Sequence, residues 1–347
     1  MTDEVLSQRQ LNRALLARQL LLERVTLPIP QALERLAGIQ NQYAPNAYIR
    51  LWSCVEGFAR EDLTRAYEDG SVVQGTLMRG TIHAVSARDY GPFAKAIREP
   101  MRAWARRAYR TEDFGREALV ERVRTSLHGR TVRRAELHEL RGDVPNATWA
   151  TIDLDAGLLR VPPSGTWERR RADVYGLADD RIPTEAEPPA HEALAHLVRR
   201  YLEGFGPASL RDVASFAGVP VTLLKPVVGE MDLRTFGDEA GGTLFDVPNG
   251  VLPDPATPAP VRFLPTWDAT LLVHARRTLV LPERYRPMIF HTTMPPSYPT
   301  FLVDGGVAGT WRYADGAVAV STFEPMARAV AAEVQAEADR LAAFHSA

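Results

Sequence analysis

Cysteine and lysine are scarce in this chain of 347 residues, which has one cysteine, Cys54, and lysine only at Lys95 and Lys225. A single cysteine excludes a disulfide framework. The amino terminus, Met1-Thr2-Asp3-Glu4, is acidic where a secretory signal peptide carries Lys or Arg. The longest apolar runs, such as 11–22, are interrupted by Asn, Arg and Gln, so none approaches the roughly 20 apolar residues of a membrane helix. These absences predict a soluble, cytoplasmic protein.

Signals for metal, serine and phosphate chemistry are also missing. The eight histidines are scattered, and none has a ligand spacing such as His-x-x-x-His backed by carboxylates. The sequence contains no Gly-x-Ser-x-Gly and no glycine-rich phosphate loop. We therefore expect no metal and no cofactor.

The charged residues give evidence both against and for nucleic-acid binding. The formal net charge of −2 argues mildly against DNA, since nucleic-acid domains are often strongly basic. Arginine, however, supplies almost all the cationic residues, and its planar fork suits phosphate. A GC-rich genome would produce the same bias. The arginines form four spaced groups, which favour a shared cationic groove although each alone is typical of a solvated helix face: Arg102, Arg106, Arg107 and Arg110; Arg130, Arg133 and Arg134; Arg169, Arg170 and Arg171; and Arg276 and Arg277.

Helices followed by a β-hairpin recur along the chain, which is the winged-helix plan. Apolar spacing predicts helices at 7–24, 31–39, 45–55 and 62–68, then a hairpin over 72–85. A second set has helices at 117–127 and 133–141 and strands at 158–161 and 172–177. A third has helices at 191–202, 209–217 and 221–228 and a hairpin over 233–247. We predict an α+β fold with winged-helix units at 1–110, 111–185 and 186–255.

The remaining segment, 256–347, is predicted to be a C-terminal β domain. It follows a linker at 252–260 that contains four prolines. Alternating apolar residues predict strands at 271–273, 278–281, 300–303, 307–313 and 317–323, and a last helix at 325–344.

Two glutamines, Gln40 and Gln42, are the most unusual pair of polar residues. They follow Leu33, Leu36 and Ile39 at the end of a predicted helix, where both amides can project toward one point. On spacing alone, helix capping or local hydrogen bonding remains the favoured interpretation.

Five short motifs, in this order, resemble those of the AlkZ-like winged-helix DNA glycosylases, a family that includes crosslink glycosylases of the YcaQ type. They are Gln40-Asn41-Gln42, Leu77 to His83, Tyr201 to Gly218, Leu264 to Asp268 and Gly305 to Arg312. The resemblance implies three tandem winged-helix motifs and a C-terminal β region around a concave DNA channel. It also implies a monofunctional glycosylase in which Gln40 and Gln42 position the attacking water. Asn41 stands where the family usually has an apolar residue.

The same resemblance implies double-stranded DNA as the partner of a monomeric, nucleoid-associated repair enzyme. Its substrates would be N7-alkylated purines, including bulky natural-product adducts or interstrand crosslinks, as in antibiotic self-resistance. The residues expected to contact DNA are Arg79, Thr81 and His83 on the first wing and the arginines at Arg106, Arg107, Arg110, Arg169, Arg170, Arg171, Arg276 and Arg277. For His83, a hydrogen bond inside the hairpin is an equally good interpretation.

Two other functions are compatible with the same sequence. A non-enzymatic winged-helix protein, such as a regulator, would bind DNA without releasing a base. A protein that sequesters a small molecule would bind it in the absence of DNA. Neither alternative needs paired amides at Gln40 and Gln42.

Overall fold

The computed structural model describes residues 4–109, 115–142, 146–183, 187–272, 277–291 and 297–347. Over these residues the fold is of the mixed α+β class, with three β-sheets. Most elements follow the predicted order, and the main differences are two helices that were not predicted, at 87–109 and 146–156, and two predicted strands that are helical instead.

The first helices and the first hairpin confirm the prediction. Ser7 begins the first helix with a capping box, in which Ser7 and Gln10 bond each other's backbone N–H groups. The helix ends earlier than expected, at Arg18, because Leu20 turns the chain with a φ of 56°. The elements are α1 (Gln8–Arg18), α2 (Ile29–Arg35), α3 (Pro45–Cys54), α4 (Arg60–Glu68), β3 (Val72–Thr76), the short 3-10 helix η1 (Met78–Gly80) and β4 (Ile82–Ser86).

A six-stranded sheet joins the first two predicted winged-helix units. Its order is β2-β4-β3-β6-β7-β5, with all pairs antiparallel. The two units meet where Gln74 and Gly75 of β3 pair with Arg160 and Leu159. Gly75 permits this close packing, since a Cβ there would lie 3.1 Å from Cδ2 of Leu159 across the pair and 2.7 Å from the Tyr90 ring. The added strands are β2 (Ile39–Gln40), β5 (Val132–Arg133), β6 (Leu158–Arg160) and β7 (Val174–Leu177).

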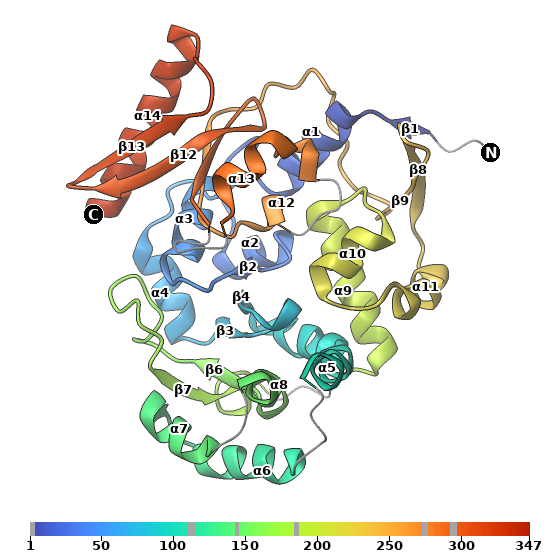
Figure 1. The fold of residues 1–347 in the computed structure, drawn as a ribbon, viewed down its shortest axis with the longest axis vertical. Coiled ribbons are helices and arrows are strands. Elements are labelled where there is room, and N and C mark those ends of the chain that lie inside the picture. Colours follow the sequence, from blue (N-terminus) through green and yellow to red (C-terminus); the bar gives the residue numbers. More distant parts are fainter. Residues whose placement is uncertain (1–3, 110–114, 143–145, 184–186, 273–276, 292–296) are drawn as a thin grey trace.

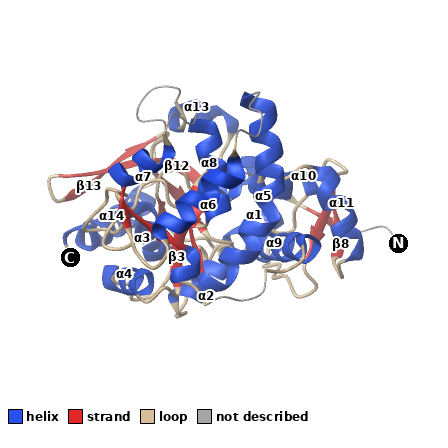
Figure 2. Ribbon diagram, turned by 90° about the horizontal axis from the view of Figure 1, so that it is seen from below, coloured by secondary structure: helices blue, strands red, loops and turns tan. Residues whose placement is uncertain are grey.

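Helices cover the far end of this sheet. The longest, α5 (Ala87–Tyr109), was not predicted and packs against α8 and α9. Figure 2, seen from below, shows α5, α6 and α8 close together on that face. The other elements here are α6 (Arg116–Leu127), α7 (Arg134–Arg141), α8 (Asn146–Ala156) and η2 (Ala178–Asp180).

The predicted third unit is a helical group with its own small sheet. Ser209 begins one of its helices with a second capping box, to Asp212. A hairpin follows, and β1 (Val5–Leu6) adds to it in parallel. Figure 1 and Figure 2 both place this sheet beside α10 and α11, at the side where the N-terminus lies. The elements are α9 (Ala190–Phe205), α10 (Leu210–Ala217), α11 (Val221–Glu230), β8 (Arg234–Asp238) and β9 (Thr243–Asp246).

The C-terminal region contains a four-stranded antiparallel sheet and a last helix. The last three strands and the helix were predicted, and the first strand, at 262–264, was not. Its strands are β10 (Arg262–Leu264), β11 (Thr300–Val303), β12 (Gly306–Ala314) and β13 (Ala317–Thr322), and its last helix is α14 (Arg328–Ser346). Figure 1 shows α14 and the β12–β13 hairpin at one end of the long axis and α6 and α7 at the other.

Two predicted strands in this region are wrong. The segments 271–273 and 278–281 overlap α12 (Ala269–Leu272) and η3 (Arg277–Leu279) instead. Asp268 accepts hydrogen bonds from the backbone N–H and hydroxyl of Thr270, which starts a helical turn where apolar spacing alone suggested a strand. The structure continues with η4 (Glu283–Tyr285) and α13 (Arg286–Ile289).

The hydrophobic core crosses the predicted unit boundaries. One cluster joins α5 and α9 with parts of the C-terminal region, and another joins α2, α3 and α4 with the C-terminal sheet. Packing therefore links the first predicted unit to the third predicted unit and to the C-terminal region. Among the described residues, no helix has the length and apolarity needed to cross a membrane.

Candidate active site

The two glutamines lie on and just after an edge strand, where the sequence predicted the end of a helix. The helix α2 stops at Arg35, and Ala37 and Gly38 turn the chain with φ values of 55° and 81°. A Cβ at position 38 would lie 2.7 Å from a methyl group of Val85, so only glycine lets the chain approach β4 this closely. The turn therefore places Gln40 in β2, opposite His83.

Hydrogen bonds orient both glutamine side chains. The Oε1 atom of Gln40 accepts from Nη2 of Arg79 at 2.8 Å, and Oε1 of Gln42 accepts from the backbone N–H of Ile82 at 2.8 Å. Because N–H groups only donate, the accepting atom of each amide is its carbonyl oxygen. Gln40 is 8% exposed and Gln42 is exposed. The pair thus combines a fixed inner amide with an outer amide at the surface.

Arg79 ties the inner glutamine to the third predicted unit. It has a φ of 58° in η1, its Nη1 donates to the carbonyl oxygen of Phe216 in α10, and its guanidinium lies 5.8 Å from the Phe216 ring centroid. Gly218 packs against its backbone. Burial lowers the pKa of Arg79 to about 10, so the side chain stays charged at neutral pH. The predicted DNA contact at Arg79 is thus a half-buried residue engaged with Gln40.

His83 and Thr81 also have bonds within the first hairpin. Nδ1 of His83 lies 3.0 Å from the carbonyl oxygen of Thr81, and the Thr81 hydroxyl donates to the carbonyl oxygen of Met78. Since a carbonyl only accepts, Nδ1 carries the proton and Nε2 is the acceptor nitrogen. Burial and the charge of Arg79 lower the pKa of His83 to about 3. At neutral pH this histidine is an uncharged ring directly across from Gln40.

Asn41, between the two glutamines, is fully buried. Its Nδ2 donates to Oε1 of Gln74 at 2.8 Å, and its Oδ1 accepts from the backbone N–H of Ala47. Nε2 of Gln74 donates in turn to the carbonyl oxygen of Gly165. A chain of amides thus connects the motif to the loop 162–173, which explains why an asparagine is compatible with this buried position.

A small cavity adjoins Gln40 on the side of the C-terminal region. It has a volume of about 10 Å³ and is lined by Gln19, Gln40, Arg50, Asp268 and six other residues, and a space of this size is near the minimum for one water molecule. Nε of Arg50 and Oδ2 of Asp268 form a buried ion pair at 3.0 Å. Nη1 of Arg50 is buried with no hydrogen-bond partner among the described residues. These are the polar groups that can hold a water next to the glutamine.

Comparison with known proteins identifies the fold and the family. The profile of the DNA glycosylase AlkZ-like family matches residues 33–344. The chain belongs to the AlkZ-like DNA glycosylase family. Among solved structures, it is similar to the Streptomyces sahachiroi DNA glycosylase AlkZ, with a TM-score of 0.85 and 21% identity over 99% of this chain and 97% of that one. Among curated proteins, no sequence matches this chain significantly.

Membership of the AlkZ-like family confirms the resemblance of the five motifs and makes DNA the substrate class of this glycosylase. A residue of the third motif meets the site through Arg79, and a residue of the fifth motif bonds the fourth motif. Phe216, from the third, accepts from Arg79, and Trp311, from the fifth, donates to the carbonyl oxygen of Leu264. Asp268, the last residue of the fourth motif, forms the buried ion pair with Arg50, which the sequence did not indicate.

The predicted arginines differ in what surrounds them. Arg170 reaches the motif, since its Nη1 donates to the hydroxyl of Tyr43 at 2.9 Å. Arg169 pairs with Asp173 at 2.7 Å, and Arg171 is exposed. Arg106 and Arg107 are exposed on α5. Arg110 and Arg276 lie outside the described residues, as does the side chain of Arg277, which begins η3.

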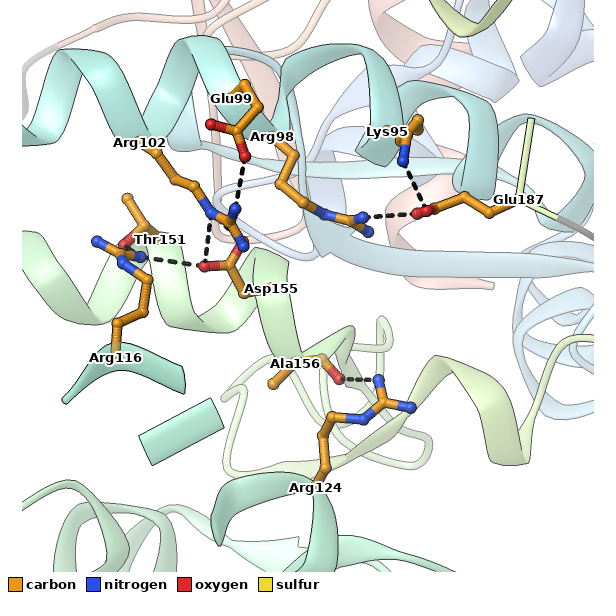
Figure 3. Close-up of polar contacts among 10 residues, drawn as sticks. All are labelled: Lys95, Arg98, Glu99, Arg102, Arg116, Arg124, Thr151, Asp155, Ala156 and Glu187. Carbon is orange, nitrogen blue, oxygen red and sulfur yellow. Dashed lines mark hydrogen bonds and ion pairs between the residues drawn. The ribbon is translucent and has the colours of Figure 1, made fainter. Parts of the chain in front are cut away.

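Several other arginines near α5 are engaged in internal ion pairs (Figure 3). Asp155 of α8 accepts from Arg102 and Arg116, each at 3.0 Å in the closest ion pair. Glu187 pairs with Lys95 at 2.8 Å and Arg98 at 2.6 Å. Part of the arginine excess therefore joins helices together. Over the described ranges, no group of three or more His, Cys, Asp or Glu residues is arranged to hold a metal ion.

Proposed function

We propose that this AlkZ-like protein is a monofunctional glycosylase that hydrolyses the N-glycosidic bond of N7-alkylated purines in double-stranded DNA. Bulky natural-product adducts and interstrand crosslinks belong to the proposed substrate range, with a role in repair or antibiotic self-resistance. The observation that carries the proposal is the pair of amides at Gln40 and Gln42, each oriented by a donor on its carbonyl oxygen.

The chemistry suits neutral amides. An N7-alkylated purine already bears a positive charge, so the C–N bond breaks with its electron pair returning to the ring, which leaves as a neutral base. Water forms the new C–O bond and loses one proton to the solvent. Each glutamine carbonyl oxygen has a second lone pair, which can accept a hydrogen bond from a water molecule. Two such bonds can hold the water near the anomeric carbon. The charge of Arg79 keeps the Gln40 amide in one orientation. No strong base is needed because the leaving group is activated.

Lysine placement supports hydrolysis without a lyase step. A Schiff-base lyase needs an unprotonated amine close to the sugar. The chain has two lysines. Lys95, on α5, is paired with Glu187. Lys225 lies in α11, in the third predicted unit.

We further propose that three winged-helix units, 1–110, 111–185 and 186–255, and the C-terminal domain, 256–347, surround a concave DNA channel. Thr81 and the predicted contact arginines, except Arg79, which orients Gln40, would bind phosphates. Such contacts position DNA without reading its sequence. We propose a monomer that acts on chromosomal DNA in the cytoplasm.

The test is base release from defined lesions. Purified protein is incubated with duplexes that carry small or bulky N7-alkylguanine, and alkaline cleavage then reveals abasic sites. We expect strand breaks at the lesion with wild-type protein and with Gln31→Ala, a control at an exposed glutamine of α2. The double variant Gln40→Ala, Gln42→Ala should lose cleavage while still binding DNA.

Two results would contradict this assignment. Intact strands for all lesions with wild-type protein, while DNA is still bound, would support a non-enzymatic winged-helix DNA-binding protein. Loss of DNA binding together with cleavage in the double variant would show that the glutamines do not act in the chemical step.

A further inference from the structure

An exposed tyrosine adjoins the catalytic pair. Tyr43 directly follows Gln42 and is 47% exposed, whereas the next residues, from Ala44 to Cys54, are all buried. Its carbonyl oxygen accepts from the backbone N–H of Asn46, so the start of α3 holds its backbone. An aromatic face beside the reacting position is thereby open to a ligand.

A cation holds this tyrosine from the other side. Arg170 donates from Nη1 to the Tyr43 hydroxyl at 2.9 Å, and its guanidinium lies 6.0 Å from the Tyr43 ring centroid and 5.1 Å from that of Trp167. Its Nε also donates to the carbonyl oxygen of Trp167. Trp167 is buried and packs edge-on against Tyr48, with ring centroids 5.7 Å apart. The tyrosine is therefore braced by an arginine that is itself anchored to the core.

The loop that carries Arg170 is fixed by internal hydrogen bonds. The Ser164 hydroxyl accepts from the backbone N–H of Asp173 at 2.7 Å and donates to the carbonyl oxygen of Arg171. Gln74 joins the loop to Asn41 through the two hydrogen bonds of its side-chain amide. The position of Arg170 relative to the catalytic glutamines is thus set in advance, which reduces the ordering cost of binding.

We propose that the Tyr43 ring, braced by Arg170, is a stacking platform for an unstacked planar group of the DNA substrate. The inference rests on the proposed function and adds a residue that favours lesion-containing DNA. Every base has a π-face, so an aromatic platform accepts bases of any sequence. Taking a base out of the helix costs a few kcal/mol, and stacking beside Gln42 offsets part of that cost. The exposed guanidinium of Arg170 has further N–H donors for a neighbouring phosphate.

The test compares the binding of three duplexes to wild-type protein, Tyr43→Ala and Tyr43→Phe. One duplex is undamaged, one contains a single unpaired bulged purine, and one carries an N7-guanine adduct with an aryl group. We expect Tyr43→Ala to bind the bulged or adducted duplex roughly 5- to 150-fold more weakly, the range of one base-stacking contact. Tyr43→Phe, which keeps the ring, should stay within about threefold of wild type, and the undamaged duplex should bind all three proteins alike.

The two modified duplexes separate the sources of the planar group. Weaker binding of both indicates that the platform stacks on a base, and weaker binding of the adducted duplex alone indicates that it stacks on the aryl group. Val5→Ala is the control, because Val5 is exposed on β1, away from the motif. Thermal unfolding checks that each variant is folded.

Equal affinity of Tyr43→Ala and wild type for all three duplexes would overturn the stacking proposal. That result is independent of base release, because the bulged duplex measures binding without any chemical step. A wild-type protein that releases no base from any lesion would overturn the proposed function alone.

Discussion

Lowering the pH should destabilise the fold through His83, and the size of the effect follows from its surroundings. The side chain is 2% exposed, and its pKa is lowered from 6.5 to about 3. The folded protein therefore keeps the ring neutral, while the unfolded chain takes up a proton below pH 6.5. The contribution of His83 to stability is complete above that value and is lost as the pH falls toward 3.

The expected loss is large on the scale of a folded domain. One pKa unit corresponds to about 1.4 kcal/mol. At pH 5 the unfolded histidine is about 1.5 pH units below its pKa of 6.5, so its protonation stabilises the unfolded chain by about 2 kcal/mol. The free energy of unfolding should thus fall by about 2 kcal/mol between pH 7 and pH 5 through His83 alone.

The variant His83→Asn isolates this contribution. An asparagine amide can donate to the Thr81 carbonyl oxygen in place of Nδ1, but it does not titrate. Urea unfolding of both proteins from pH 7.5 to 4.5 gives two curves of unfolding free energy against pH. Their difference cancels the contributions of all other titrating groups. One of these is His345, because burial also lowers its pKa, to about 4. We expect the difference to shrink by about 2 kcal/mol by pH 5. Parallel curves would refute the reasoning that burial holds His83 neutral.

Two further substitutions test the contacts around the glutamines. Arg79→Met should lower kcat about 10- to 100-fold with little change in KM, because Gln40 loses the donor that orients it; single-turnover kinetics measure this, and an unchanged kcat would exclude a positioning role. Asn41→Leu should cost about 2 kcal/mol in urea unfolding, since it leaves the carbonyl oxygen of Gln74 and the N–H of Ala47 unpaired. Adding Gln74→Leu should recover part of that loss, and full additivity would show that the two amides do not interact.

The candidate site was only partly visible in the sequence. Spacing drew attention to Gln40 and Gln42, and the family resemblance assigned them a role, but neither could indicate their orientation. Arg79 was selected as a DNA contact, and nothing in the sequence indicated that it also contacts Gln40 and Phe216, which is 137 residues away. Asp268 lies in the fourth motif, but its ion pair with Arg50 could not be predicted, because Arg50 is distant in the chain. Such contacts depend on how separate segments pack.

The amino-acid sequence by itself determined most local elements of this protein. Capping residues, apolar spacing and turn glycines act over a few positions, so α3, the first hairpin and the strands β11 to β13 could be predicted. Only the tertiary structure decided that β3 pairs with β6, that β2 forms an edge beside β4, and which arginines are engaged in internal ion pairs. These arrangements depend on burial between distant segments, where a charged side chain is stable only if a partner arrives with it.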